Sequence, residues 1–247
     1  MARVFITGSA DGLGLAVGQR LVDQGHQVVL HARSAARAED ARRAAPGVEG
    51  MLIGDLSSDA QTRALADAAN ASGRFDVVIH NAGVGSGGDG RTEDGRSTLL
   101  AVNVLAPYLL TALMTRPDRL VYLSSGMHRS GSADLAALDT PSYGDTKLLD
   151  AALAAGVARR WPQVLSNAVD PGWIKTRMGG SGAPGSLDEG AATQVWLATS
   201  DDPAATVTGR YFKDLAEERP ASAVQDEAFQ DALLAVLARA TGTDLPA

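Results

Sequence analysis

Tyr143 and Lys147 stand four residues apart in the segment Tyr143-Gly144-Asp145-Thr146-Lys147. The segment is predicted to be helical, because Thr140 suits the N-cap, Pro141 suits the first helical position, and leucines and alanines follow. Positions i and i+4 of a helix lie on one face, so a phenol and an ammonium are held side by side. An unperturbed tyrosine has a pKa of ~10, and a neighbouring cation favours the phenolate and eases proton transfer at neutral pH. The pair is therefore a candidate general acid and base, while a solvated helix face with the same spacing is the competing interpretation.

A glycine-rich turn near the amino terminus has the pattern of a phosphate site. A short buried strand at 3–7 leads into the turn, and a helical pattern follows. This context suits a dinucleotide, since glycine lets the backbone approach the pyrophosphate and the helix start offers free N–H groups. The spacing G-x-x-x-G-x-G differs from the commonest fingerprint, and a plain tight turn is the alternative. The expected cofactor contacts in this turn are Gly8, Ser9, Asp11, Gly12, Leu13 and Gly14.

The residues after the second strand bear on which nicotinamide nucleotide is bound. That strand is predicted at 26–31, and in NAD-selective sites an acidic residue at its end receives the ribose 2′-hydroxyl. Ala32-Arg33-Ser34 stands there instead, with Arg37 one helical turn later. A guanidinium suits a 2′-phosphate, because it forms charge-assisted and often bidentate contacts. Arg33 therefore favours NADP(H) over NAD(H), unless it is a surface charge that points into water.

Short apolar runs alternate with helical patterns along the chain, which predicts an α/β fold class. The alternation is typical of a doubly wound parallel sheet with helices on both faces. Right-handed crossovers place the carboxyl ends of such strands at one edge, where ligands bind. We expect a single Rossmann-fold domain over residues 1–247 with a mostly parallel, seven-stranded sheet. Strands are predicted at 3–7, 26–31, 51–53, 75–79, 119–123, 164–169 and 209–212, and helices after the first at 35–45, 59–71, 97–115, 141–160, 188–200 and 226–240.

Other stretches have an expected place in or near the site. Asp55 and Leu56 end the third strand, where an adenine would rest, and residues 85–90 form a flexible stretch. Asn103 lies in an otherwise apolar helix and needs a hydrogen-bonded amide there. The glycine-rich stretch 178–190 follows the sixth strand and is interpreted as part of a substrate lid at about 176–190, with a disordered linker as the alternative.

Composition excludes several classes of function. The 247 residues are 45% hydrophobic and 21% charged, which is ordinary for a soluble globular protein. A formal charge of −7 without a basic cluster argues against nucleic acid or a membrane as the main partner. The chain has no cysteine, which excludes disulfides and thiolate catalysis, and its four histidines have no metal-ligand spacing. The uncharged run 97–115 carries Asn103 and Pro107, so it is interpreted as a buried helix, and a cytoplasmic protein is expected.

Six motifs follow one another along the chain. They are Thr7-Gly8-x-x-x-Gly12-x-Gly14, Asn81-Ala82-Gly83, the Val-Asn helix of Asn103, Ser124-Ser125, Tyr143-x-x-x-Lys147, and Pro171-Gly172 with Thr176. In this order they resemble the short-chain dehydrogenase/reductase family over almost the whole chain, although each string alone is a weak signal. Within the family, the segments most similar to the retinol-dehydrogenase-like branch are Thr92-Glu93-Asp94-Gly95, Ser124-Ser125-x-x-His128 and Gly209-Arg210-Tyr211-Phe212.

The resemblance implies hydride transfer between a nicotinamide and a ketone, aldehyde or secondary alcohol. Tyr143 would be the general acid or base, and Lys147 would assist it and hold the nicotinamide ribose. Asn103 would anchor a water that connects Lys147 to solvent. Further cofactor contacts implied by the family are Asn81, Ala82, Gly83, Tyr143, Lys147, Pro171, Gly172, Trp173, Ile174 and Thr176.

The serine that would hydrogen-bond the substrate oxygen stays open between three residues. Ser125 is preferred because it directly follows a convincing strand, and Ser124 is the second candidate. Ser130 is the third, since it lies 13 residues before Tyr143, as is common in the family.

Two other functions on the same fold compete with this one. The first is a non-catalytic NADP(H)-binding regulatory protein, which would typically have lost the tyrosine or the lysine. The second is an epimerase or dehydratase acting on nucleotide sugars, which would typically be longer. The family also suggests a homodimer or homotetramer through the helices that hold Tyr143 and Gln194. The substrate itself is not readable, although Met127, His128, Trp173 and Met178 are candidate pocket residues.

Overall fold

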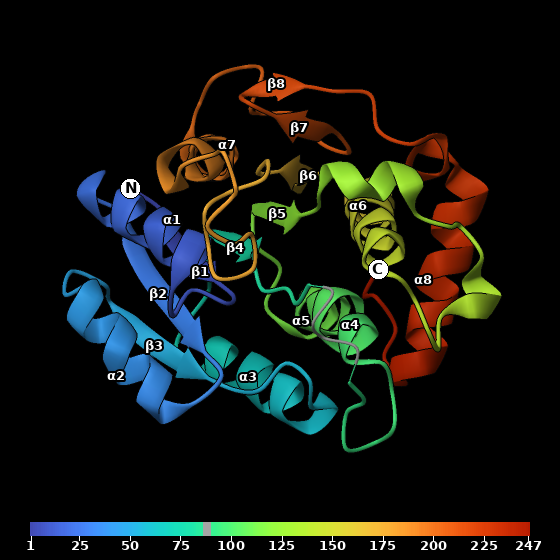
Figure 1. The fold of residues 1–247 in the computed structure, drawn as a ribbon, viewed down its shortest axis with the longest axis horizontal. Coiled ribbons are helices and arrows are strands. Elements are labelled where there is room, and N and C mark those ends of the chain that lie inside the picture. Colours follow the sequence, from blue (N-terminus) through green and yellow to red (C-terminus); the bar gives the residue numbers. More distant parts are fainter. Residues whose placement is uncertain (86–89) are drawn as a thin grey trace.

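A single eight-stranded sheet forms the centre of the molecule (Figure 1). The computed structural model describes residues 1–85 and 90–247, so most of the stretch 85–90, which was expected to be flexible, lies outside the described residues. The strand order is β3-β2-β1-β4-β5-β6-β7-β8. The strands are β1 Arg3–Ile6, β2 Gln27–Ala32, β3 Gly50–Ile53, β4 Val77–His80, β5 Arg119–Leu123, β6 Leu165–Asp170, β7 Tyr211–Lys213 and β8 Ala216–Glu217.

The sheet is parallel from β1 to β7, and β8 runs antiparallel to β7. The predicted mostly parallel, doubly wound sheet is therefore confirmed, with eight strands where seven were expected. The extra strand β8 is two residues long and follows a turn in which Asp214 and Leu215 have φ angles of 49° and 63°. A strand this short carries no readable alternation in the sequence.

The strand order reverses at β1, which lies between β2 and β4. Open α/β sheets bind ligands in the crevice at the carboxyl ends of the two strands that flank such a reversal. Thr7 directly follows β1 and Asn81 directly follows β4. The fold therefore places the glycine-rich turn and the Asn81-Ala82-Gly83 motif on either side of one crevice.

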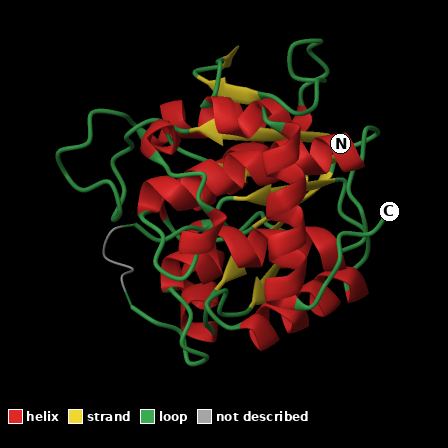
Figure 2. Ribbon diagram, turned by 90° about the vertical axis from the view of Figure 1, so that its right-hand side faces the viewer, coloured by secondary structure: helices red, strands yellow, loops and turns green. Residues whose placement is uncertain are grey.

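Helices cover both faces of the sheet, and strands β1 to β7 contribute side chains to both layers. Val4 and Ile6 of β1 lie in the core with α1 and α7, whereas Phe5 lies in the core with α3, α5, α6 and α8, an alternation expected of a strand buried on both faces. The helices are α1 Gly12–Asp23, α2 Ala35–Ala44, α3 Asp59–Ala71, α4 Thr98–Leu100, α5 Ala106–Leu113, α6 Tyr143–Arg160, α7 Leu187–Thr199 and α8 Glu227–Thr241. In Figure 2 both termini lie on one side of the molecule and the longest loops project on the opposite side.

The uncharged run 97–115 is not one continuous α-helix as predicted. A π-helical segment, Ala101–Leu105, separates α4 from α5 and has Asn103 at its centre. Short π-helical segments inside helices occur frequently at functional sites. None of the helices in the described part of the chain has the length and apolar character to cross a membrane.

Helix α6 begins two residues later than predicted. Its N-cap is Ser142, not Thr140: Ser142 Oγ accepts a hydrogen bond from the Asp145 N–H at 3.1 Å, and the Asp145 carboxylate accepts one from the Ser142 N–H at 2.7 Å. This reciprocal pair is a capping box, and it overrides the Thr140-Pro141 signal. Helix α8 packs along α6, with Leu234 against Gly156.

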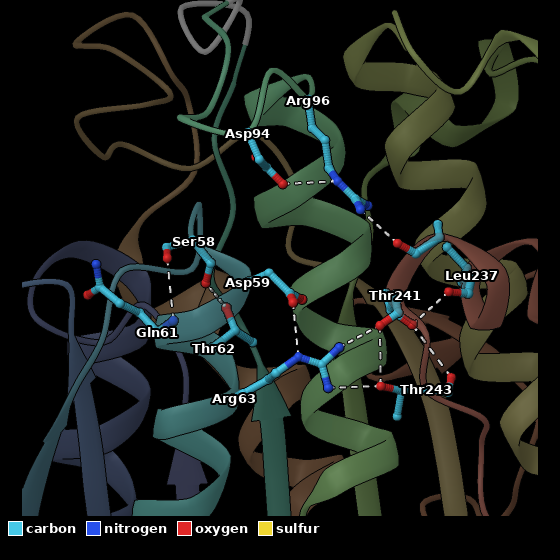
Figure 3. A network of polar contacts seen from close by, with 11 residues as sticks. Ser58, Asp59, Gln61, Thr62, Arg63, Asp94, Arg96, Leu237, Thr241 and Thr243 are labelled. Carbon is cyan, nitrogen blue, oxygen red and sulfur yellow. Dashed lines mark hydrogen bonds and ion pairs between the residues drawn. The ribbon is translucent and has the colours of Figure 1, made fainter.

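Two arginines tie the end of α8 to the rest of the molecule (Figure 3). Arg63 of α3 pairs with Asp59, donates to Thr243 Oγ1 at 2.9 Å and also donates to the Thr241 carbonyl. Arg96 pairs with Asp94 at 3.1 Å and donates to the Ala240 carbonyl at 2.7 Å. The carbonyls at the end of α8 thus receive guanidinium donors, which satisfies groups that a helix end leaves unpaired.

Candidate active site

The glycine-rich turn packs directly against the loop that follows β4. Gly8 has a φ of 62°, and a Cβ placed on it would lie 2.6 Å from the Ala82 Cα. A Cβ on Gly14 would lie 2.4 Å from the Asn81 Nδ2 atom. Gly12 has a φ of 55°, which is also in the left-handed region. Glycine is therefore required in this turn by close approach of the two loops and by backbone conformation.

Asn81 holds the turn in place. Its Nδ2 donates to the carbonyls of Thr7 and Gly8, both at 3.0 Å, and Thr7 Oγ1 accepts from the Ala82 N–H at 3.0 Å. The Asn81 Oδ1 atom is buried and has no hydrogen-bond partner within residues 1–85 and 90–247. Because a buried acceptor without a partner is uncommon, this atom is a candidate to receive a donor from a ligand at the crevice.

His31 and Ser9 hold the glycine-rich turn through hydrogen bonds. His31 was not among the residues expected at the site. The Gly8 N–H donates to His31 Nδ1 at 2.9 Å, so the proton is on Nε2, which donates to the Gly54 carbonyl at 2.8 Å. Burial lowers the pKa of His31, which keeps the ring neutral. Ser9 Oγ accepts from the His31 N–H and donates to the Ile6 carbonyl, both at 2.8 Å. Ser9 was expected to contact cofactor, and its hydroxyl is used inside the protein.

The start of α1 is free to receive an anion. The helix begins at Gly12, its first turn contains no acidic residue, and the Asp11 side chain makes no capping bond. Asp11 instead pairs with Arg37 from α2 and with Arg177 at 3.0 Å. The first N–H groups of a helix lack intrahelical partners and carry partial positive charge, so this end suits a pyrophosphate.

The two arginines after β2 are placed differently. Arg33 directly follows β2 and is exposed, whereas Arg37 is half-buried and bound to Asp11 and Asp40. Arg37 contacts Asp11 of the glycine-rich turn, and Arg33 follows the end of β2, where the ribose of an adenine nucleotide would lie. Asp55, at the end of β3, uses Oδ1 to accept from the backbone and hydroxyl of Ser57, and Leu56 is buried.

Tyr143 and Lys147 lie on one face of α6, as the spacing predicts. The Lys147 Nζ atom lies 5.8 Å from the centre of the Tyr143 ring. The lysine is buried, with 3% of its surface exposed, and its Nζ donates to the carbonyl of Leu123, the last residue of β5. A Cβ on Gly83 would lie 3.6 Å from the same Nζ. The ammonium is thus fixed between the ends of β4 and β5, at the edge where the glycine-rich turn lies.

The three candidate serines have different hydroxyl partners. Ser124 Oγ is buried and donates to the Lys147 carbonyl at 2.8 Å, and Ser130 Oγ donates to the Met127 carbonyl at 2.9 Å. Ser125 Oγ is half-buried and accepts from the Met127 N–H at 3.2 Å, which leaves its own proton available. Of the three, Ser125 is the serine whose hydroxyl donates to no partner in the part of the chain that the structure describes.

The loop between β6 and α7 extends across the glycine-rich turn. A Cβ on Gly12 would lie 3.7 Å from Thr176 Cγ2, and one on Gly85 would lie 3.1 Å from Met178 Cγ. Gly172 has a φ of 82°, and its N–H donates to Asp170 Oδ1 at 2.8 Å. Part of the stretch 176–190, which was expected to form a lid, is regular structure, because residues 187–190 are the first turn of α7.

The loop has internal order as well. Ile174 is buried and forms a parallel bridge with Gly185, and the indole of Trp173 donates to the Gly179 carbonyl at 2.9 Å. A Cβ on Gly179 would lie 2.0 Å from the Ile174 carbonyl oxygen. The glycines of this stretch are therefore needed for close backbone packing as well as for turns.

The residues suggested for the substrate pocket divide into two groups. His128 is fully buried: its Nδ1 donates to the Ser125 carbonyl at 2.7 Å and its Nε2 accepts from the Ala221 N–H at 3.1 Å. It therefore supports the loop that holds Ser125 and lines no open surface. The exposed apolar side chains next to the site are Met127, Trp173 and Met178, with 54%, 62% and 54% of their surface exposed.

Comparison with known proteins identifies the family of this chain. The model of the short chain dehydrogenase family matches residues 2–185. An uncharacterized oxidoreductase of Emericella nidulans is 44% identical over 100% of this chain and 99% of its own length. A short-chain dehydrogenase of Penicillium rubens is 40% identical over the full length of both chains. Retinol dehydrogenase 14 of Mus musculus is 31% identical over 91% of this chain and 81% of its own.

Solved structures share the fold. A crystal structure of an uncharacterized protein from Mycobacterium paratuberculosis superposes with a TM-score of 0.84 at 26% identity, covering 100% of this chain and 96% of that one. A blue fluorescent protein from a metagenomic library, in complex with NADPH, superposes with a TM-score of 0.70 at 24% identity, covering 86% and 95% of the two chains.

Proposed function

This chain belongs to the short-chain dehydrogenase family, and within it we propose that the protein is an NADP(H)-dependent oxidoreductase acting on a ketone or aldehyde and the corresponding alcohol. It is an oxidoreductase that resembles the retinol-dehydrogenase-like members of the family. The observation that carries the finer assignment is the position of Lys147, whose ammonium is held at the end of β5 with the Tyr143 ring 5.8 Å away.

The crevice at β1 and β4 fits a nicotinamide nucleotide. The Gly8, Gly12 and Gly14 backbone would receive the pyrophosphate at the start of α1. Arg33 and Arg37 would bind the 2′-phosphate, which distinguishes NADP(H) from NAD(H). The remaining contacts would come from Asp55, Leu56, the Asn81-Ala82-Gly83 loop, and the 171–176 segment with Thr176. When bound, the nicotinamide supplies or accepts the hydride.

Tyr143 would move the proton of the reaction. In the reduction direction its hydroxyl gives a proton to the substrate oxygen, and in the oxidation direction the phenolate takes it back. The ammonium of Lys147 would assist this transfer by its charge and would hold the ribose hydroxyls. Ser125, with its hydroxyl proton free, would donate to the substrate oxygen and stabilise the charge that forms there.

Asn103 would act through the structure around Lys147. A Cβ on Gly83 would lie 3.5 Å from Asn103 Oδ1 and 3.6 Å from Lys147 Nζ, so the two side chains flank the same glycine. By family analogy Asn103 would help a water connect Lys147 to solvent.

The exposed apolar side chains favour an apolar substrate. Met127 follows Ser125, and Trp173 and Met178 come from the loop that crosses the glycine-rich turn. We propose that this loop closes over a hydrophobic carbonyl compound or alcohol, since exposed apolar groups around a site commonly mark a binding surface. Trp173 also donates to Gly179, which couples the indole to the conformation of the loop.

Helices α6 and α7 hold Tyr143 and Gln194, the two residues of the expected interface between copies. Helix α8 packs along α6, and Gln194 of α7 is fully buried. The homodimer or homotetramer through these two helices stays a prediction.

Nucleotide titration tests the cofactor assignment. The purified protein is titrated with NADPH and NADH by fluorescence, together with Arg33→Ala, Arg37→Ala and the control Arg43→Ala, an exposed arginine on α2 that pairs with Asp40. We expect NADPH to bind at least about tenfold tighter than NADH, and Arg33→Ala to lose roughly 10–100-fold in NADPH affinity alone. Equal affinity for the two nucleotides would refute the NADP(H) assignment. Tight binding without turnover of any carbonyl or alcohol would favour a regulatory protein.

A further inference from the structure

Helix α6 carries a second buried charge beside its lysine. Asp150 lies three residues after Lys147, and its Oδ2 is 3.7 Å from Lys147 Nζ. The Asp150 side chain is 2% exposed, and its Oδ1 has no hydrogen-bond partner among the described residues. Its immediate neighbours along the helix, Leu149, Ala151 and Ala152, are apolar and buried. Burying a carboxyl group with one unpaired oxygen in such surroundings lowers the stability of the fold. Packing therefore does not explain the presence of Asp150 at this position.

The groups that face Asp150 from other elements are neutral. Burial, and then the charge of Asp150, raises the pKa of Tyr122 on β5, so this phenol stays protonated. Tyr122 OH is bound to Thr111 Oγ1 of α5 at 2.7 Å, and Thr111 Oγ1 is 3.1 Å from His80 Nε2 of β4. Burial lowers the pKa of His80 to about 3, so this ring is uncharged. Lys147 is therefore the cation with which Asp150 interacts.

Two properties of Lys147 make the contact relevant to the site. Its ammonium donates to the Leu123 carbonyl and lies beside the Tyr143 ring. An ammonium in a buried place is maintained by a nearby carboxylate, whose charge also offsets the pull of the ammonium on other groups. The charge on Asp150 therefore determines how strongly Lys147 acts on its other neighbours.

We propose that Asp150 is a positioning residue that fixes the place and effective charge of the Lys147 ammonium, and through Lys147 sets how readily Tyr143 exchanges its proton. The first part depends on the contact between the two side chains, and the second part rests on the proposed function. With Asp150 ionised, the Asp150–Lys147 pair is neutral and the phenol of Tyr143 is held protonated, which suits a general acid. With Asp150 protonated, the ammonium acts on the phenol unopposed.

The state of Asp150 changes in the physiological range. Burial raises its pKa to about 7, against a smaller lowering by Lys147. Lys147 Nζ lies 3.7 Å from the Asp150 carboxylate, so the ionisation of Asp150 is expected to change the surroundings of the Lys147 side chain. Below this transition the site holds the charge of Lys147 alone, and above it the charges of Lys147 and Asp150 offset each other.

Lysine NMR tests the first part without turnover or nucleotide. The sequence has three lysines, Lys147, Lys175 and Lys213, so 13C-labelled lysine gives three Cε signals, assigned with Lys175→Arg and Lys213→Arg. We expect the Lys147 signal to shift with a midpoint near pH 7 in the unaltered protein and in Tyr143→Phe, and to lose this midpoint in Asp150→Asn. A Lys147 signal without a midpoint near pH 7, or one that keeps it in Asp150→Asn, would overturn the proposal. Asp150→Ser, which also removes the charge, is measured in parallel in case one variant folds poorly.

The second part is read from the pH profile of the nucleotide-dependent reaction. In Asp150→Asn the rise of alcohol oxidation with pH is expected to begin roughly 0.5–1 unit lower, because the phenol loses the opposing charge. The control Asp231→Asn removes an exposed carboxylate that pairs with Arg159 at the far end of α6 and should leave the profile unchanged. Identical profiles for Asp150→Asn and the unaltered protein would refute the tuning role. A protein that turns over no carbonyl or alcohol would refute the proposed function and, with it, the tuning role, while the NMR result would still decide the Asp150–Lys147 contact.

Discussion

The side-chain amide of Asn103 pairs with the backbone of Val84 in both directions. Asn103 Oδ1 accepts from the Val84 N–H at 2.8 Å, and Asn103 Nδ2 donates to the Val84 carbonyl at 3.0 Å and to Thr146 Oγ1 at 3.0 Å. Thr146 belongs to α6, one residue before Lys147. One amide at the centre of the π-helical segment thus joins the loop after β4 to the helix of the candidate acid and base.

Replacing Asn103 should therefore cost more stability than its size suggests. Asn103→Ala leaves the N–H and carbonyl of Val84 without these partners and removes the donor to Thr146 Oγ1, which keeps its bond to the Tyr143 carbonyl. The free energy of unfolding should therefore fall by about 2–4 kcal/mol. The measurement is equilibrium unfolding in urea. Asn70→Ala is the control, because Asn70 also bonds two backbone groups but is exposed. Equal losses of unfolding free energy in the two variants would show that the hydrogen bonds of Asn103 contribute no more to stability than those of Asn70.

Gly14→Ala should destabilise the protein although alanine favours helices. Gly14 lies in the first turn of α1, where alanine would normally stabilise by up to about 1 kcal/mol. Its Cβ would lie 2.4 Å from Asn81 Nδ2 and 2.7 Å from the Gly8 carbonyl oxygen, so the turn has to open. We expect a lower melting temperature and weaker nucleotide binding. Gly182→Ala, with no heavy atom within 4 Å of the new Cβ, should change neither quantity, and a Gly14→Ala protein as stable as this control would contradict the packing argument.

Asp150 should make the protein less stable as the pH rises. Its pKa is raised from 3.8 to about 7 in the folded state, so the folded protein binds the proton more tightly than the unfolded chain. The stabilising contribution is then complete below pH ~4 and is lost as the pH rises through about 7, by up to about 4 kcal/mol. The buried histidines act in the opposite direction, because their pKa values are lowered. The free energy of unfolding is measured from pH 4 to 8 for Asp150→Asn and for the unaltered protein, and the difference between them isolates Asp150. This difference should favour the variant increasingly as the pH rises. A constant difference would mean that Asp150 does not titrate as described.

Lys147→Met should be most harmful above neutral pH. The change removes the cation beside Asp150, and a buried carboxylate without a partner is strongly unfavourable. We expect a loss of about 3–5 kcal/mol at pH 8 and a smaller loss at pH 5, where Asp150 is protonated. Adding Asp150→Leu to Lys147→Met should restore part of the stability at pH 8. If the double variant were less stable than Lys147→Met, the two side chains would not be coupled as a charge pair.

The sequence predicts the sheet and most helices because their signals are local. The ranges expected for α3 and β5 agree with Asp59–Ala71 and Arg119–Leu123, since apolar runs and helix caps lie within a few residues of one another. The errors have other causes. The capping box of Ser142 competes with the Thr140-Pro141 signal, the π-helical segment has no known signature in this run, and β8 is too short for an alternation.

In the candidate site, too, the sequence predicts the features that depend on neighbouring residues and misses those that depend on distant ones. The i, i+4 spacing is enough to place Tyr143 and Lys147 on one face of α6. The choice between serines depends on hydroxyl partners that are distant in sequence, such as the Lys147 carbonyl for Ser124. His31, Arg177 and Asp150 were missed for the same reason, because their contacts with the turn or with Lys147 exist only in the folded chain. An aspartate amid apolar residues of a predicted helix was the one available signal for Asp150.

The most direct test of the account is turnover by Tyr143→Phe. NADPH consumption is measured with a panel of aromatic and aliphatic ketones and aldehydes, together with NADPH affinity, for the unaltered protein and for Tyr143→Phe. We expect turnover of at least one hydrophobic carbonyl compound, a loss of roughly 100-fold or more in Tyr143→Phe, and nearly unchanged NADPH affinity in the variant. Equal rates for the two proteins would contradict Tyr143 as the proton donor, and no turnover by the unaltered protein with any carbonyl, or with alcohols and NADP⁺, would contradict the proposed function.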